Sequence, residues 1–99
     1  MRHARPEDLD RLEPLLARLR ALPALPALKE KSRGVFYWKG RSFLHFHADP
    51  AGLFADVREA GGRDFIRLQV NGAAGADQLV SIAALQVGDA SGAPTSKPD

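Results

Sequence analysis

Apolar residues recur at helical spacing near the start of the chain. Leucines fall three and four positions apart between residues 6 and 22, which predicts an amphipathic helix with one buried stripe. Pro6 suits the first helical position, and the acidic residues that follow suit the positive end of the helix dipole. Pro14 interrupts the pattern, so the helix either kinks there or a second helix begins there. The stripe consists of Leu9, Leu12, Leu15, Leu16, Leu19 and Leu22.

The middle of the chain has the pattern of a four-stranded antiparallel meander. Short runs rich in aromatic, β-branched and aliphatic residues alternate with turn sequences. Lys39-Gly40 is typical of a two-residue hairpin turn, and Asp49-Pro50-Ala51-Gly52 has Asp to start a turn and Gly to finish it. Ala60-Gly61-Gly62-Arg63 is the third turn. The predicted strands are residues 35–38, 42–48, 53–59 and 64–70.

The turn lengths set a register that the apolar pattern can test. Opposed residues of antiparallel strands share a face, and this register collects apolar side chains on one face. Helices can cover that face, so the sequence predicts a two-layer α+β sandwich with the order α-β-β-β-β-α. The predicted rows are Leu44–Val57–Ile66 and Phe46–Ala55–Leu68, with Val35 opposite Leu44.

Flanking segments complete the predicted domain. The run 22–26 contains two prolines and predicts an extended connector between the first helix and the first strand. Residues 76–86 predict a second helix with apolar residues available for burial. From residue 88 the chain is rich in Gly, Ser, Ala and Pro. We therefore expect one domain over residues 1–87 and a disordered tail over residues 88–99.

The same register decides which side chains point away from the helices. A sheet face in water is mostly polar, whereas this one mixes large aromatic side chains with His, Asp and Arg. That mixture is the feature of the sequence that requires a functional explanation. The candidate face consists of Phe36, Trp38, Phe43, His45, His47, Phe54, Asp56, Arg58, Phe65 and Arg67.

Four explanations of the candidate face stay open. We favour a homodimer in which two such faces pack together, because interfaces favour aromatics and Arg and small domains gain stability by associating. The alternative is a nucleic-acid-binding module, with aromatics stacking on bases and the basic loop 29–33 contacting phosphates. A third explanation is a small-ligand pocket under the connector that uses His45, Asp56 and Arg67. In the fourth, the N-terminal arm or the tail covers the aromatics.

His45-Phe46-His47 is an H-x-H pattern that metal sites use. Histidines at i and i+2 of a strand face the same way, and Asp56 is predicted beside His45, so three ligands can meet. The same side chains can instead form a structural polar row, in which His45 pairs with Asp56 and His47 packs on Phe54. We favour the structural row, and the sequence predicts neither a bound metal nor a cofactor.

Composition narrows the function classes. The 99 residues suit one domain, and 44% hydrophobic with 26% charged residues is ordinary for a soluble globular protein. The absence of cysteine excludes a disulfide framework, a thiol nucleophile and a Cys-ligated metal. No apolar run reaches membrane-spanning length, and acidic residues follow the basic N-terminus where a signal peptide has an apolar run. We expect a cytoplasmic, non-enzymatic domain with no membrane partner.

Charge is unevenly distributed along the chain. Residues 1–47 hold 10 Lys/Arg against 5 Asp/Glu, and residues 48–99 hold 4 against 7, within a net charge of +2. A basic first half permits an anionic partner without requiring one.

Two stretches resemble a known family. Residues 22–30 form a Leu-Pro connector that ends in Glu, and residues 34–58 combine an aromatic strand, a Lys-Gly turn, a hydrophobic strand and an Asp-Pro-x-Gly turn. This layout, over roughly residues 9–86, resembles the small uncharacterised bacterial MmcQ/YjbR-like proteins, although the chain lacks a Trp-containing segment at the end of the meander. The resemblance implies the same helix–meander–helix fold and suggests DNA binding by analogy, and it implies no catalytic residues.

Overall fold

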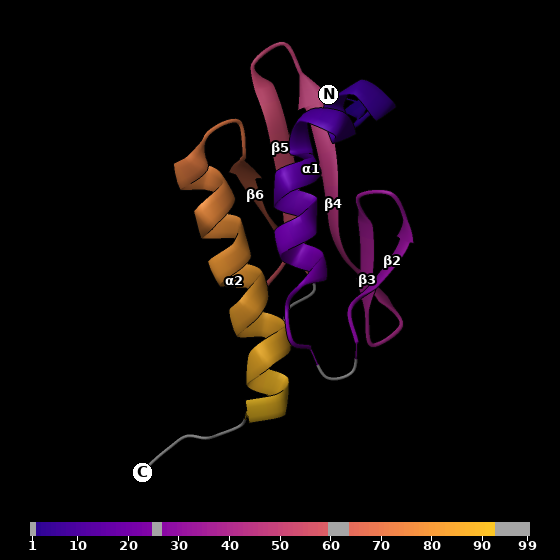
Figure 1. Ribbon diagram of the computed structural model, residues 1–99, viewed down its shortest axis with the longest axis vertical. Helices are drawn as coiled ribbons and strands as arrows, with labels where there is room; N and C mark the ends of the chain where they lie inside the picture. The colour runs from indigo at the N-terminus through magenta and orange to yellow at the C-terminus, as the bar shows by residue number, and fades with distance from the viewer. Residues whose placement is uncertain (1, 25–26, 60–63, 93–99) are drawn as a thin grey trace.

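The protein begins with a short strand and a helix, continues through a sheet and ends with a second helix. The computed structural model describes residues 2–24, 27–59 and 64–92. Figure 1 shows how these elements follow one another. They are β1 (Arg2–His3), α1 (Pro6–Arg20), β2 (Lys29–Ser32), β3 (Val35–Trp38), β4 (Arg41–Asp49), β5 (Gly52–Arg58), β6 (Phe65–Gln69) and α2 (Ala73–Gly92).

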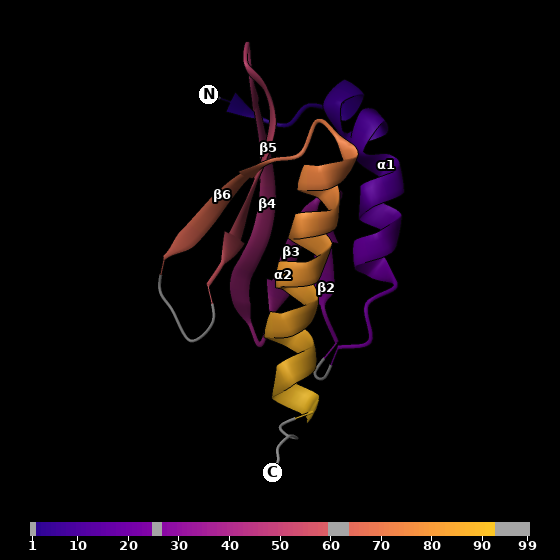
Figure 2. The ribbon, with the colours of Figure 1, turned by 90° about the vertical axis from the view of Figure 1, so that its left-hand side faces the viewer.

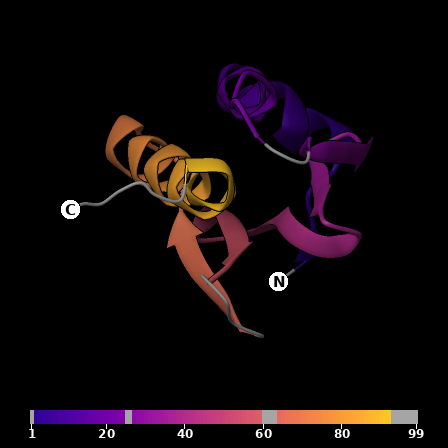
Figure 3. The same ribbon diagram turned by 90° about the horizontal axis from the view of Figure 1, so that it is seen from below.

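Two layers make up the molecule, with both helices on one face of an antiparallel sheet (Figure 2). The strands lie in the order β2-β3-β4-β5-β6, and β1 pairs with β4 beyond the end of β3. Viewed from below, α1 and α2 sit on the same side of the curved sheet (Figure 3). The predicted α+β sandwich with N- and C-terminal helices is therefore confirmed. Neither helix, in the part of the chain that the structure describes, combines the length and apolarity needed to cross a membrane.

The core forms where the apolar stripe of α1 meets the sheet. α1 is one continuous helix, and Pro14 lies exposed inside it, so no second helix begins there. α2 contributes Leu79, Ala83 and Val87, which recur every four residues and therefore share one helix face. All of the predicted leucines are buried except Leu22, which is half-buried. The buried leucines of α1 are Leu9, Leu12, Leu15, Leu16 and Leu19.

The predicted register of the last three strands is confirmed. Turn chemistry holds it in place: the Asp49 carboxylate accepts a 2.8 Å hydrogen bond from the Ala51 amide, and Asp49 pairs with Gly52 across the turn. Lys39 and Gly40 both have positive φ, as a tight hairpin turn requires. The observed rows are Leu44–Val57–Ile66 and Phe46–Ala55–Leu68.

A β-bulge overturns the predicted register of the first hairpin. Trp38 pairs with Arg41 as expected, but the register then shifts, and Phe36 lies opposite Leu44. The prediction that Val35 lies opposite Leu44 is therefore wrong. The extra residue turns Phe36 toward the helices, where it is 1% exposed. Burying this large ring removes more apolar surface from water than burying Val35 would, and this favours the shifted register.

Two strands were not predicted. Residues 29–32, expected as part of a basic loop, form β2 and pair with β3 across a second irregularity at Glu30 and Ser32. Residues 2 and 3 form β1 along β4. The sheet therefore has more strands than the predicted four-stranded meander.

The C-terminal helix is longer than predicted. α2 runs over Ala73–Gly92, so it begins three residues earlier and ends six residues later than the predicted 76–86. The start of the predicted disordered tail, residues 88–92, is therefore helical. The rest of that tail, the turn residues 60–63 and the connector residues 25–26 lie outside the described residues.

Asp8 organises the start of α1. Its carboxylate accepts a 2.9 Å hydrogen bond from the Arg5 amide, which closes the first helical turn in the manner of a capping box. The same carboxylate accepts hydrogen bonds from Arg2 at 2.7 Å and Arg11 at 3.2 Å. The Arg2 hydrogen bond, followed by the Arg5 amide, lowers the pKa of Asp8 to about 2. The N-terminal arm and α1 are thus joined at one ionised side chain.

We predict that Asp8 gives the fold part of its acid stability. The folded-state pKa of about 2 lies below the ordinary value of 3.8, so the contribution is present above about pH 4 and is lost as pH falls toward 2. Asp8→Asn should lower the urea midpoint at pH 7 and flatten its decline between pH 4 and 2. Glu7→Gln, at the exposed neighbouring position, is the control and should lower the urea midpoint less than Asp8→Asn does. Equal pH profiles for the wild type and Asp8→Asn would contradict this role.

We also predict that α2 tolerates no side chain at Gly75. A Cβ built there would lie 1.9 Å from the Gln69 carbonyl oxygen, because the helix begins against the end of β6. Gly75→Ala should cost about 1–3 kcal/mol or more in the free energy of unfolding, measured by urea titration. Gly88, in the same helix, has open space where a Cβ would stand, and Gly88→Ala should stabilise by about 0.5–1 kcal/mol. Equal effects of the two substitutions would refute this packing.

Candidate metal centre on the open sheet face

The sheet face turned away from α1 and α2 carries a compact polar cluster. We call this side the open face. Its rows follow from the observed register: His45, Asp56 and Arg67 form one, and the next holds His47. The second row continues with Phe54 and Gln69, and the third holds Arg58 and Phe65.

Asp56 is the centre of the cluster. It lies on β5, with a strand on each side, and is 7% exposed. Arg67 holds the carboxylate with two hydrogen bonds, from Nε to Oδ1 at 2.7 Å and from an Nη to Oδ2 at 2.8 Å. These bonds lower the pKa of Asp56 despite its burial, so the side chain is a carboxylate at neutral pH. The open face therefore carries an ionised carboxylate at its centre.

Both strand histidines turn toward the same carboxylate oxygen. His47 Nε2 lies 3.1 Å from Asp56 Oδ2, and His45 Nε2 lies 3.5 Å from it. Burial lowers the pKa of His45, which favours the neutral imidazole with a free nitrogen lone pair. The H-x-H spacing on β4 and the position of β5 thus bring two imidazoles and one carboxylate to a single point.

Aromatic contacts fix the orientation of the imidazoles. The His45 ring meets the His47 ring edge-on at 4.9 Å and the Phe65 ring at 5.2 Å. Arg58 lies over the Phe65 ring, with its guanidinium carbon 4.5 Å from the ring centre. His3 from β1 stacks on His47, with ring centres 5.2 Å apart. Rotation of either strand imidazole is therefore restricted.

The distances suit a divalent metal ion. The ligand atoms of His45, His47 and Asp56 all lie within 4.8 Å of one another. Adjacent ligands of a tetrahedral zinc at about 2.1 Å are about 3.4 Å apart, close to the 3.1 and 3.5 Å that separate the two imidazoles from the carboxylate. Small movements of the side chains would place one ion between the three.

The bulge removes aromatic side chains from the predicted candidate face. Phe36 and Phe43 are buried, at 1% and 3% exposure, and the prediction that they belong to an exposed aromatic face is wrong. Trp38 packs against the core and lies 6.1 Å from the Phe43 ring. The other predicted members are where the register put them, and of these Phe54 and Phe65 are half-buried. The face is therefore more polar than predicted.

Side chains of the predicted basic loop, residues 29–33, already make contacts within the fold. Arg33 forms ion pairs with Asp10 at 2.8 Å and Glu13 at 2.9 Å, which tie it to α1. Lys31 lies 4.5 Å above the ring of Tyr37. Phosphate contact by these side chains would require those interactions to break, so the structure adds no support for a nucleic-acid surface here.

His3 is the cluster residue that sequence analysis missed. It precedes the first helix, and a two-residue strand has no detectable alternation, so nothing in the pattern placed it beside His47. The pairing of β1 with β4, which the structure reveals, places His3 there.

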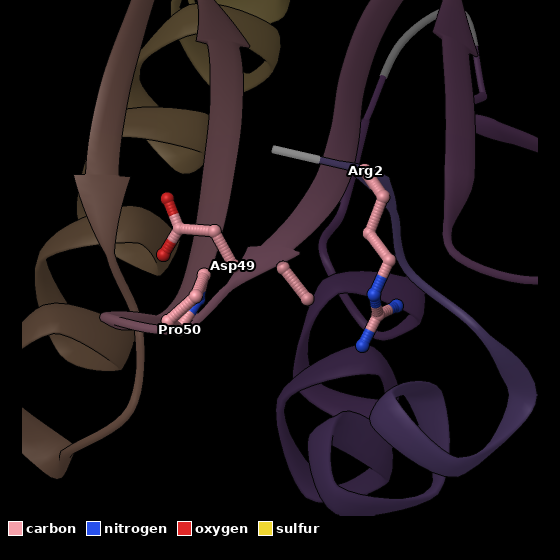
Figure 4. Close-up of a pocket in the computed structure, with 4 residues that line it drawn as sticks. Arg2, Asp49 and Pro50 are labelled. Carbon is pink, nitrogen blue, oxygen red and sulfur yellow. The ribbon is translucent and has the colours of Figure 1, made fainter.

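Two larger surface hollows lie outside the cluster. The largest of those described, about 470 Å³, opens where β1 meets the turn after β4 and is lined by Arg2, Ala48, Asp49 and Pro50. Figure 4 shows Arg2 and Asp49 on opposite sides of it, with their charged ends turned away from each other. Arg2 is already paired with Asp8. The hollow thus has no set of converging polar groups that would define a ligand.

Comparison with protein-family models, with curated proteins and with solved structures finds no match to this chain. The resemblance to MmcQ/YjbR-like proteins, and the DNA binding that it suggests, therefore stay predictions. Any proposal about function rests on the geometry of the open face.

We predict that Asp56 stabilises the sheet through Arg67. Asp56→Ala should lower the free energy of unfolding by about 1–3 kcal/mol, because it leaves the paired groups without a carboxylate. A double-mutant cycle with Arg67→Ala, followed by urea unfolding, should give a favourable coupling energy. Strict additivity of the two substitutions would show that the observed hydrogen bonds contribute nothing to stability.

Proposed function

We propose that this domain binds a divalent transition-metal ion on its open sheet face. His45, His47 and Asp56 are the ligands. The observation that supports the proposal is the approach of both imidazole Nε2 atoms to one buried carboxylate oxygen, at 3.5 and 3.1 Å. The sequence prediction favoured a structural polar row, and the convergence of the three donors is the reason for preferring the metal.

The surroundings of Asp56 favour an ion between the ligands. Arg67 fixes the orientation of the carboxylate and keeps it ionised, as the groups around a metal ligand commonly do. Each carboxylate oxygen has two lone pairs, so Oδ2 can accept from Arg67 and still face the histidines. Because β4 and β5 are interior strands of the sheet, the three ligands stand on a rigid base.

The donor set indicates which metals fit. Two imidazole nitrogens and one carboxylate oxygen suit Zn²⁺, Co²⁺, Ni²⁺ and Cu²⁺ better than Ca²⁺ or Mg²⁺, which prefer oxygen ligands. The chain has no cysteine, so a thiolate site for Cu⁺ or an iron–sulfur cluster is not available to it. Zinc is therefore the appropriate probe, and cobalt a spectroscopic substitute.

The homodimer that the sequence predicted loses part of its support. Three aromatics assigned to the interface, Phe36, Trp38 and Phe43, belong to or pack on the core. Within the described residues, Leu85 on α2 is the large apolar side chain with high exposure, at 60%. Self-association through the open face stays a prediction. We place the domain among binding proteins because His45, His47 and Asp56 bring their donor atoms together.

The metal proposal predicts stoichiometric zinc binding by tag-free protein. Isothermal titration should show one ion per chain, and zinc at 100 times its dissociation constant should stabilise the fold by about 2.7 kcal/mol. His47→Gln should weaken binding by at least about 100-fold, because it removes one of three ligands, and cobalt should lose its visible absorption band in the same variant.

A carboxylate remote from the cluster provides the control for this experiment. Asp77 on α2 is exposed and pairs with Arg18 on the helix layer, so Asp77→Asn should bind zinc as the wild type does. If the wild type binds no zinc, or if His47→Gln and Asp77→Asn bind it equally, the cluster is a structural polar row and the proposal is wrong.

A further inference from the structure

β1 is an ordered strand with few attachments of its own. Both of its residues are exposed, and it pairs with β4 only through Arg2 with Ala48 and His3 with His47. The Ala4 amide adds a 3.2 Å hydrogen bond to the Phe46 carbonyl. Segments with so little burial open at low free-energy cost, so a further contact to β1 would change its stability appreciably.

His3 is within reach of both strand histidines. It lies directly opposite His47 in the ladder, where Cβ atoms are about 5 Å apart, and its ring stacks on that imidazole. A cavity of about 50 Å³ separates the end of β1 from the start of β3, and both His3 and His45 line it. The His3 ring therefore has open space beside it on the side of His45, one of the three proposed ligands.

The three ligands on β4 and β5 leave one tetrahedral position unfilled. Protein zinc sites fill this position either with water or with a fourth side chain. Among the His, Asp and Glu side chains of the described residues, the group with mutually close donor atoms is His45, His47 and Asp56, and His3 is the imidazole that stacks beside it. A ligand tethered in the same ladder has a high effective concentration compared with a free one.

We infer that His3 is the fourth ligand and that the metal fastens β1 onto β4. This inference rests on the proposed metal site. The ion would cross-link an N-terminal strand of low stability to the centre of the sheet, so the exposure of residues 2–4 would depend on metal. With the metal bound, β1 would cover this edge of β4. Without the metal, the edge would be available for pairing and the Phe46 carbonyl would lose its hydrogen bond from Ala4. Such a device makes the domain a reporter of zinc and not only a store of it.

The first measurement is amide hydrogen exchange of the tag-free full chain with and without zinc. Zinc should slow exchange of the Ala4 amide at least tenfold, because that amide is bonded to Phe46 only while β1 is docked. The matched variant is His3→Ala, which should still bind one zinc ion, at least tenfold more weakly, without slowing exchange at Ala4. Cobalt bound to His3→Ala should show the spectrum of a site with water in place of one imidazole.

Arg2→Gln provides the control because it weakens β1 and leaves every proposed metal-ligating side chain in place. It removes the ion pair to Asp8, so exchange at Ala4 should be faster in the absence of zinc and should still slow when zinc is added. If His3→Ala binds zinc with wild-type affinity and slows exchange at Ala4 as the wild type does, the inference is overturned while the three-ligand site stands. If the wild type binds no zinc at all, both the site and the inference fall.

Discussion

The partners and the register of the central strands depend on one carboxylate that is almost removed from water. Asp56 sits on an interior strand at 7% exposure, and an ionised group there is stable only if charged or hydrogen-bonding partners surround it. Arg67 supplies two of those bonds, and His45 and His47 approach from the other side. The requirement also enforces register. A slip of one residue would place Asp56 among the core side chains, with no partner to compensate its charge.

The same requirement explains why the centre of the sheet could be predicted from sequence. Asp56 falls opposite His45 and Arg67 as soon as the two turns that flank β5 are counted, and local chemistry closes the turn before it. The Asp49 side chain bonds the Ala51 amide within that turn, so the count of loop residues is reliable. Prediction succeeded where short-range chemistry and long-range burial gave the same answer.

Prediction failed where burial overrode short-range chemistry or where an element was too short to have a pattern. The hairpin turn at Gly40 was predicted, but the bulge beyond it was not. The bulge depends on the space that the helices leave for the Phe36 ring, and the sequence of the strand alone does not indicate how large that space is. β2 was hidden because Glu30 faces α1, where Arg20 holds it with two hydrogen bonds, so its alternation is not one of apolar and polar residues. His3 was missed because two residues have no period.

The ion pair between Arg2 and Asp8 has a consequence for how this domain can vary. Asp8 closes the first turn of α1 and also holds the strand that carries His3, so helix initiation and the geometry of the open face share one side chain. The two properties are therefore coupled through Asp8. A substitution at this position alters the start of α1 and also loosens the strand that carries His3 on the far side of the sheet.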